Sequence, residues 1–251
     1  MAVNVKVKNI LVTQPKPETD KNPYFDLAKK FNVKIEFRPF IQIEGIPANT
    51  FRKDRINISE FQAVILLSRQ AADHYFRMAA EMRFTSFDEI KFFCVSESTA
   101  FYLQKYITYR KRKIFYGKHS INDLMDVVKK HKKDKFLLPC SDVLNPDIAA
   151  TLNEHEIDFT KAAIYRTVSS DLSDLKVDTY DMIVFFSPSG VTSFMQNFPK
   201  FKQGNTRIAA FGATTAQTVL DSKLKLDVQA PVPAAPSMTM AIEQYIKVAN
   251  K

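Results

Sequence analysis

The 251-residue sequence contains few cysteines, glycines and histidines, and each scarcity excludes a class of site. Five glycines provide neither a GxGxxG turn nor a phosphate-binding P-loop, which argues against a nucleotide site. The four histidines, His74, His119, His131 and His155, lack metal-ligand spacing and are expected at the surface. Two isolated cysteines do not make a zinc site. We therefore expect no bound metal and no cofactor.

Long apolar runs are also missing. The longest, such as Ala63–Leu67 and Met182–Phe186, have the length of strands and are far too short to cross a bilayer. The N-terminal residues up to Lys8 alternate valine with lysine and lack the apolar core of a signal peptide. Cys94 and Cys140 each end an apolar run, which is typical of buried free thiols in a reducing compartment. These features predict a cytoplasmic protein that does not associate with membranes.

Acidic residues are outnumbered, and the formal net charge of +9 points to a polyanionic partner. The densest basic stretches are Lys105–Lys118 and Lys129–Lys135. Neither comes with a recognition-helix, zinc-finger or aromatic RNA-binding signature, so we do not expect a nucleic-acid partner. A small polyanion would explain the sign of the charge equally well, and charge alone does not separate the two interpretations.

Short segments rich in valine, isoleucine and phenylalanine alternate with segments of helical period. This pattern predicts an α/β fold with mostly parallel sheets flanked by helices. The expected strands are Asn9–Val12, Ala63–Leu67, Lys91–Val95, Lys113–Phe115, Phe136–Pro139, Met182–Phe186, Arg207–Phe211 and Asp227–Gln229. A representative helix presents Ile121, Leu124, Met125 and Val128 on one face, with Ser120 as its N-cap. Such apolar faces are expected to pack on the sheets.

An internal repeat divides the chain. Ala63–Ser68 aligns with Met182–Ser187, and both segments run directly into a helical pattern. Further on, Phe93–Ala100 aligns with Ala209–Ala216, and each is a strand, a polar turn and the start of a helix. Two matches in the same order indicate two similar α/β domains.

The turns after these strands are candidate anion sites. Ser187–Gly190 and Gly212–Thr215 carry hydroxyls and helix N-terminal amides at the edge where open α/β sheets bind ligands, a combination that suits carboxylate or phosphate. Serine and threonine also cap helices, and their repetition in both halves leaves both interpretations open. Ser187 does not lie in a G-x-S-x-G elbow, and no histidine is placed to activate it, so a catalytic triad is not expected.

At these residues the sequence resembles the uroporphyrinogen-III synthase family. Phe185–Val191 is similar to that family's F-F-S-P-S-G segment, and Ala210–Ala216 to its A-x-G-x-T-T-A. Leu138–Ser141, an N-P-x-I helix start and Ala163–Val168 resemble its strand, helix and tyrosine-bearing segment. Ile10–Pro15 resembles its N-terminal strand and T-R-P turn. The resemblance covers nearly the whole chain in the family's order.

The resemblance implies two α/β domains joined by a two-strand connector, because in this family the chain leaves the first domain and later returns to it. Carried over here, the first domain holds residues 1–38 plus 169–251, and the second holds 45–159. The connector strands are 40–43 and 162–168. Nothing in the sequence requires more than a monomer.

The implied activity is a cofactor-independent cyclisation of hydroxymethylbilane to uroporphyrinogen III, with loss of water and inversion of the terminal pyrrole ring. This linear tetrapyrrole carries eight carboxylates, which suits a basic protein. Tyr165 is the candidate acid that assists loss of the hydroxyl group, although it could instead pack within the connector. The candidate substrate-binding residues are Thr13, Ser68, Thr99, Ser141, Ser187, Ser189, Gly190, Thr214 and Thr215.

Several positions depart from the family pattern. Gln14 stands where an arginine is usual, Ser96 and Glu97 replace a glycine-containing turn, and Ser68–Gln70 differs from T-S-x-N-A-V. These differences motivate a second hypothesis, a catalytically inactive ligand-binding or regulatory protein on the same scaffold. A third hypothesis is a nucleic-acid-binding protein that uses Lys105–Lys118.

Overall fold

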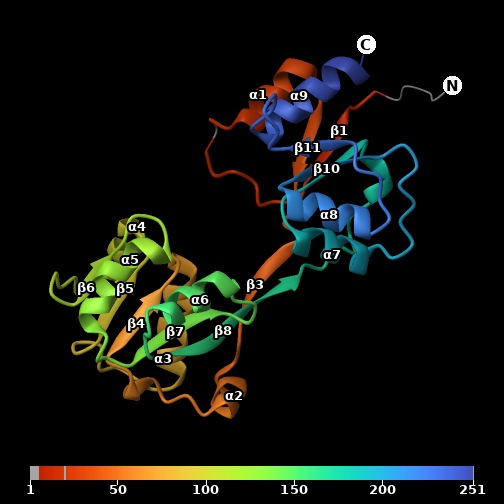
Figure 1. Ribbon diagram of the computed structural model, residues 1–251. Coiled ribbons are helices and arrows are strands. Elements are labelled where there is room, and N and C mark those ends of the chain that lie inside the picture. The colour runs from red at the N-terminus through yellow and green to blue at the C-terminus, as the bar shows by residue number, and fades with distance from the viewer. Residues whose placement is uncertain (1–5, 20, 251) are drawn as a thin grey trace. The chain divides into compact units, whose positions relative to one another are not determined.

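A computed structural model describes residues 6–19 and 21–250 and divides the chain into two compact units (Figure 1). Unit 1 contains the described residues up to Gln42 together with those from Val168 onward, and unit 2 is Ile43–Thr167. Residues 1–5, 20 and 251 lie outside the described residues. Most of the N-terminal valine–lysine segment, and the first and last residues of the expected first domain, therefore lie outside them too.

Unit 1 is built on a five-stranded sheet of order β11-β10-β9-β1-β2, in which every neighbouring pair is parallel. Its strands are β1 (Asn9–Val12), β2 (Lys34–Phe37), β9 (Met182–Phe185), β10 (Arg207–Phe211) and β11 (Val228–Ala230). Its helices are α1 (Pro23–Phe31), α7 (Pro188–Asn197), α8 (Ala213–Asp221) and α9 (Met238–Ala249), with a 3-10 turn at Val177–Thr179.

Helices cover both faces of the unit 1 sheet. Successive strand residues point to opposite faces, so Ile10 packs with α1 and α9, whereas Leu11 packs with α7 and α8. Figure 1 shows α1 beside α9, and α7 beside α8. Burial on both faces explains why these strands read as continuous apolar runs in the sequence.

The sequence pattern failed to predict α1 and β2. β2 pairs with β1 from Asn9–Lys34 to Val12–Phe37. Lys34 and Glu36 interrupt the apolar pattern of β2. Polar residues are tolerated there because β2 is an edge strand of the sheet.

Unit 2 contains the second sheet, of order β3-β8-β7-β4-β5-β6, in which the pairs from β8 to β6 are parallel. Its strands are β3 (Ile41–Gly45), β4 (Ala63–Leu66), β5 (Lys91–Cys94), β6 (Ile114–Tyr116), β7 (Phe136–Ser141) and β8 (Phe159–Ser169). Its helices are α2 (Ala48–Phe51), α3 (Arg69–Glu81), α4 (Glu97–Tyr102), α5 (Ile121–Val128) and α6 (Pro146–Glu154), with 3-10 turns at Arg52–Asp54, Ile58–Glu60, Leu103–Lys105 and Lys129–His131.

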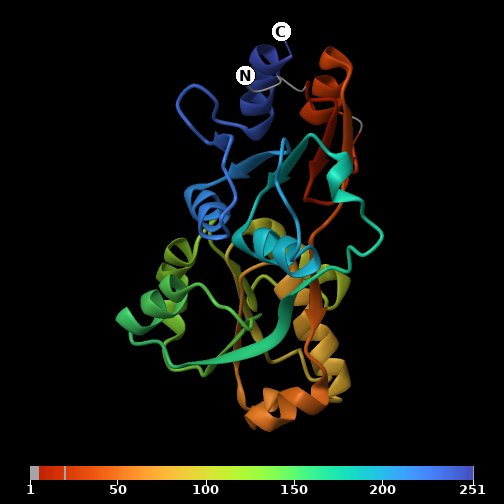
Figure 2. The same ribbon diagram turned by 90° about the vertical axis from the view of Figure 1, so that its right-hand side faces the viewer.

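The second sheet is also covered on both faces. Val64 and Leu66 pack with α3 and α4, whereas Ala63 and Ile65 pack with α5 and α6. The chain passes between the units along β3 and β8, which overlap the expected connectors 40–43 and 162–168. Figure 2 shows β8 as one long bent strand in teal. The expected α/β fold class, with two similar domains and a two-strand connector, is confirmed.

The internal repeat corresponds to equivalent local structures. Ser68 and Ser187 are both extended N-cap residues, and their hydroxyls accept hydrogen bonds from the backbone N–H groups of Ala71 and Gly190 respectively. Ser96 caps α4 in the same way, but the equivalent residue of the second copy, Gly212, caps α8 without a side chain. Capping by serine is therefore real in three of the four turns.

In the part of the chain that the structure describes, none of the helices combines the length and the apolar character required to span a membrane.

Candidate functional site

The polar residues of unit 2 gather at one edge of its sheet, because the carboxyl ends of neighbouring parallel strands lie side by side. Ser68 follows β4, Ser96 follows β5, and Gly117 follows β6. On the other side of β4, Ser141 ends β7 and is paired with Tyr165 of β8. Segments far apart in the sequence thus meet at this edge.

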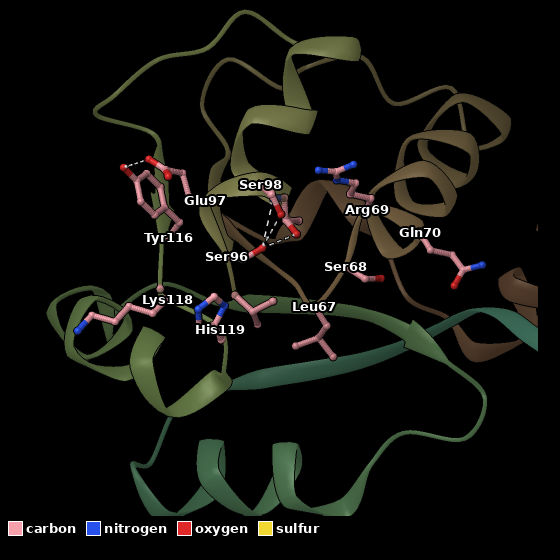
Figure 3. Close-up of a pocket in the computed structure, with 13 residues that line it drawn as sticks. Leu67, Ser68, Arg69, Gln70, Ser96, Glu97, Ser98, Tyr116, Lys118 and His119 are labelled. Carbon is pink, nitrogen blue, oxygen red and sulfur yellow. Dashed lines mark hydrogen bonds between the residues drawn. The ribbon is translucent and has the colours of Figure 1, made fainter. Parts of the chain in front are cut away.

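A pocket of about 930 Å³ opens at the carboxyl ends of β4, β5 and β6 (Figure 3). Most of the residues that line it have polar side chains, and it includes the two turns that depart most from the family pattern. The lining residues are Leu67, Ser68, Arg69, Gln70, Val95, Ser96, Glu97, Ser98, Thr99, Tyr116, Gly117, Lys118 and His119. The N-terminus of the 13-residue helix α3 also faces this pocket through Ser68 and Arg69, which adds a favourable field for an anion.

The charges around the pocket favour a negatively charged ligand. Within the described residues, neither Arg69 nor Lys118 forms a salt bridge, and the Arg69 guanidinium lies over the Tyr102 ring at 5.6 Å. Glu97 is the acidic group at the pocket, and its carboxylate accepts a hydrogen bond from the Tyr116 hydroxyl at 3.0 Å. Figure 3 shows this pair at one margin of the pocket and Arg69 with Gln70 at the other. Glu97 is thereby kept away from Arg69.

Two of the expected binding residues in unit 2 have occupied hydroxyls. The Thr99 side chain is buried, and its hydroxyl lies 3.0 Å from that of Ser96. The Ser141 hydroxyl donates to the neighbouring Asp142 carboxylate at 2.8 Å. Ser98 presents the exposed hydroxyl of this edge, whereas the Ser96 hydroxyl is half-buried and accepts from the Thr99 backbone.

Tyr165 lies at this edge with only 9% of its surface exposed. Cys140 and Ser141 of β7 pair with Ala163 and Tyr165, so Ile164 is an extra residue in β8. Such a β-bulge changes the direction of the side chains that follow it, and here it sets the orientation of Tyr165.

Burial raises the pKa of Tyr165, and the Cys140 thiol adds to this effect. Hydrogen bonds from the Ser68 side chain and from the Ser141 backbone act in the opposite direction, because they stabilise the phenol oxygen. The phenol therefore stays protonated at neutral pH. As a protonated phenol, Tyr165 can donate a hydrogen bond.

Unit 1 has a smaller polar edge. Thr13 follows β1, Ser187 follows β9 and Gly212 follows β10, and these three strands are neighbours in the sheet. Gly190 lies against the first two: a Cβ at this position would be 3.4 Å from the Ser187 hydroxyl and 3.8 Å from the Thr13 hydroxyl. Ser189 is exposed in the same turn. The structure therefore brings these four expected residues together.

The remaining two candidates begin helix α8. Gly212 has φ +88°, a conformation that residues with side chains rarely adopt, and it lets the chain turn from β10 into the helix. Thr214 is exposed in the first turn, whereas Thr215 is buried with its hydroxyl toward Gly212. Thr214 is therefore available to a ligand, and Thr215 is part of the packing.

Sequence reasoning missed several residues at the unit 2 edge. Lys118 was treated as part of a basic stretch and His119 as a surface histidine, although their place between a strand and a capped helix was a usable signal. His74 and His131 were expected at the surface, and both are half-buried. The His131 ring packs against Phe93, and His74 stacks on Tyr165. Within residues 6–19 and 21–250, no group of three or more histidine, cysteine, aspartate or glutamate residues is arranged to hold a metal ion.

The chain matches a known protein family over most of its length. The family model described as Uroporphyrinogen-III synthase HemD matches residues 24–240. The sequence has no significant match among curated proteins.

Two solved structures share the fold of this chain. Uroporphyrinogen-III synthetase from Helicobacter pylori superposes with a TM-score of 0.59 at 17% identity, covering 96% of this chain and 99% of that one. A mutant uroporphyrinogen III synthase from Thermus thermophilus gives a TM-score of 0.51 at 12% identity, covering 97% and 98%. At such low identity these similarities concern the fold alone.

Proposed function

The chain belongs to the uroporphyrinogen-III synthase family, whose reaction is the cyclisation of hydroxymethylbilane to uroporphyrinogen III in haem biosynthesis, and we propose that Tyr165 assists the loss of water in this reaction. One observation carries the proposal. Ser68 lines the unit 2 pocket and is also one of the groups that lower the pKa of Tyr165, so the phenol lies close to a residue that borders the place where a ligand can bind.

The proposed step is the departure of the substrate's hydroxyl group. The bond between carbon and oxygen breaks as the adjacent pyrrole nitrogen supplies an electron pair, which leaves an electrophilic azafulvene. Tyr165 donates its hydrogen bond to the departing hydroxide, and the N–H proton that the pyrrole ring releases on becoming the azafulvene converts this hydroxide into water. Because burial raises the pKa of Tyr165, the phenol acts as a hydrogen-bond donor and only weakly as an acid. Its contribution should therefore be modest.

Most of the rate and all of the product specificity are assigned to positioning. The bilane can close without ring inversion, so the protein must hold it for attack at the substituted end of the terminal ring. Positioning of this kind can contribute ~7–11 kcal/mol in favourable intramolecular reactions. We assign carboxylate binding to Arg69, Lys118 and the Ser96–Ser98 turn in unit 2. Thr99 and Ser141 support the unit 2 turns. In unit 1 we assign carboxylate binding to the Ser187–Gly190 turn, Thr13 and Thr214, with Thr215 as support.

We also propose that the reaction needs no cofactor. Loss of water followed by ring closure is a heterolytic sequence with no net oxidation or reduction, and a hydrogen-bond donor and positioned carboxylates suffice for it. We propose further that the protein is a cytoplasmic monomer. Cys94 and Cys140 are both buried free thiols, as a reducing compartment permits.

A nucleic-acid partner is disfavoured by the ion pairs of the basic stretch 105–118. Lys105 pairs with Asp73 at 3.0 Å, Arg110 with Asp88 at 2.9 Å, and Lys113 with Glu89 at 3.0 Å. Each pair offsets a charge that would otherwise be available to phosphates.

The test is the isomer composition and rate of product formation from freshly generated hydroxymethylbilane. We expect Tyr165→Phe to lower kcat by about three- to tenfold, the loss of one hydrogen bond, with type III product retained. The ratio of the two rates should be constant up to about pH 9, since the raised pKa keeps the phenol protonated there.

Tyr75→Phe is the matched control, because the Tyr75 hydroxyl is buried in the same unit without a hydrogen-bond partner in the described structure. It should leave kcat unchanged. Equal rates for Tyr165→Phe and the wild-type protein would refute the role of Tyr165. Type I product alone, at the uncatalysed rate, from the wild-type protein would establish the inactive binding scaffold instead.

A further inference from the structure

His74 and Arg77 lie one helical turn apart on α3 and contact the segment of β8 that carries Tyr165. The His74 ring stacks on the Tyr165 ring, with centroids 5.0 Å apart and an angle of 23° between the planes. Arg77 Nε donates a hydrogen bond to His74 Nδ1 at 3.3 Å. The histidine ring is therefore fixed between a guanidinium and a phenol.

Arg77 also fixes the bulge of β8. Its Nη2 donates to the carbonyl oxygen of Ile164 at 2.8 Å, and Ile164 is the extra residue directly before Tyr165. The same Nη2 donates to the carbonyl of Ile46 at 3.0 Å. Its Nη1 pairs with Glu81 at 2.5 Å, and the other carboxylate oxygen of Glu81 accepts from the Ala48 backbone at 3.0 Å.

Arg77 fits closely against the backbone that it holds. A Cβ at Gly45 would come within 2.8 Å of the guanidinium, so a side chain there would displace Arg77 from this position. The planar guanidinium presents donors in several fixed directions at once, which lysine cannot reproduce. This explains why one side chain can contact a histidine, an acid and two carbonyls.

We propose that His74 and Arg77 are positioning residues for Tyr165: Arg77 holds the β8 bulge and the His74 ring, and that ring sets the plane of the phenol. The proposal rests on the role given to Tyr165 above. Burial, then the nearby Arg77, lower the pKa of His74, while Asp73 acts in the opposite direction. The ring is accordingly neutral at pH 7, and it can stack without placing a second cation beside the phenol.

The experiment compares Arg77→Met, His74→Ala and His74→Phe by kcat, KM and isomer ratio, each in the wild-type background and in the Tyr165→Phe background. We expect Arg77→Met and His74→Ala to lower kcat by about three- to tenfold, the effect of losing the Tyr165 hydrogen bond, with KM unchanged. In the Tyr165→Phe background the same changes should have little further effect, because there is no phenol left to position. His74→Phe keeps a stacking ring and should retain more kcat than His74→Ala.

Arg52→Met, which removes an exposed arginine of the same unit, is the control for loss of charge. Equal losses in the wild-type and Tyr165→Phe backgrounds would overturn the positioning role, as would unchanged kcat in Arg77→Met and His74→Ala. If Tyr165→Phe alone has no effect, the role of Tyr165 itself fails, which is a separate outcome. Should Arg77→Met not fold, the kcat values of His74→Phe and His74→Ala decide whether the proposal holds. Higher kcat in His74→Phe supports it, and equal kcat for the two variants overturns it.

Discussion

The serine at the end of each repeated strand has a local and a functional role that can be separated. Ser187 and Ser68 both cap the helix that follows them, and this explains their presence without any ligand. Both hydroxyls also lie at the carboxyl edge of a parallel sheet, where ligands of such folds bind. At Ser187, capping uses a lone pair of the oxygen and leaves the hydroxyl proton available to a carboxylate, whereas the Ser68 hydroxyl also acts on the Tyr165 phenol.

A pair of substitutions at Ser187 separates these roles. Ser187→Ala removes the cap and should lower the free energy of unfolding by about 1 kcal/mol. Ser187→Asp keeps a capping oxygen but places a negative charge where we propose that carboxylates bind, so stability should be retained while KM rises. Chemical denaturation and steady-state kinetics measure the two effects. An unchanged KM in Ser187→Asp would show that this turn does not bind the substrate.

At the scale of elements, helix α8 differs from its repeat partner α4. The turn before α8 uses Gly212 with positive φ and no capping side chain, whereas the turn before α4 is capped by Ser96. The two threonines in the first turn of α8 differ in their surroundings. Thr214 faces solvent, and Thr215 is buried with 2% of its surface exposed.

Separate substitutions of the two threonines should give opposite results. Thr214→Ala removes an exposed hydroxyl, so the free energy of unfolding should change by less than about 0.5 kcal/mol, while KM rises. Thr215→Ala removes buried atoms and should lower the free energy of unfolding by about 1 kcal/mol, with a smaller effect on KM. Thermal unfolding and initial rates check both. The reverse order of effects on KM would place the ligand contact at Thr215.

At the scale of the whole molecule, the excess of basic residues is the property that matches the substrate. The net charge is +9, and several basic side chains of the stretch 105–118 are paired with acids. Arg69 and Lys118, at the unit 2 pocket, form no salt bridge with any described residue. The field of the protein should therefore assist the binding of a substrate with eight carboxylates.

Binding should accordingly weaken with salt. Raising ionic strength from low to about 0.5 M should increase KM about three- to tenfold, since exposed ion pairs of ~0.2–1 kcal/mol each are screened. The kcat value should change little, because the proposed Tyr165 hydrogen bond is buried. Arg69→Gln with Lys118→Gln should raise KM at low salt and flatten its dependence on salt. A KM independent of ionic strength would argue against carboxylate binding by these cations.

The sequence by itself determined the strands, the capped turns, the repeat and the family. These are local signals: β1 and β10 lie where the apolar runs predicted them, and Ser68 and Ser187 cap helices that begin directly after them. The same logic failed for β2, because an edge strand does not need an apolar run.

Only the tertiary structure decided which side chains surround Tyr165. The contact of Arg77 with Ile164 joins residues 87 positions apart, and no sequence pattern near either residue predicts it. The sequence predicted His74 at the surface, because the residues around it on α3 do not reveal that its ring stacks on Tyr165 of β8. Strand order and a single bulge bring these groups together, so the surroundings of the phenol follow from long-range pairing, which local sequence patterns do not encode.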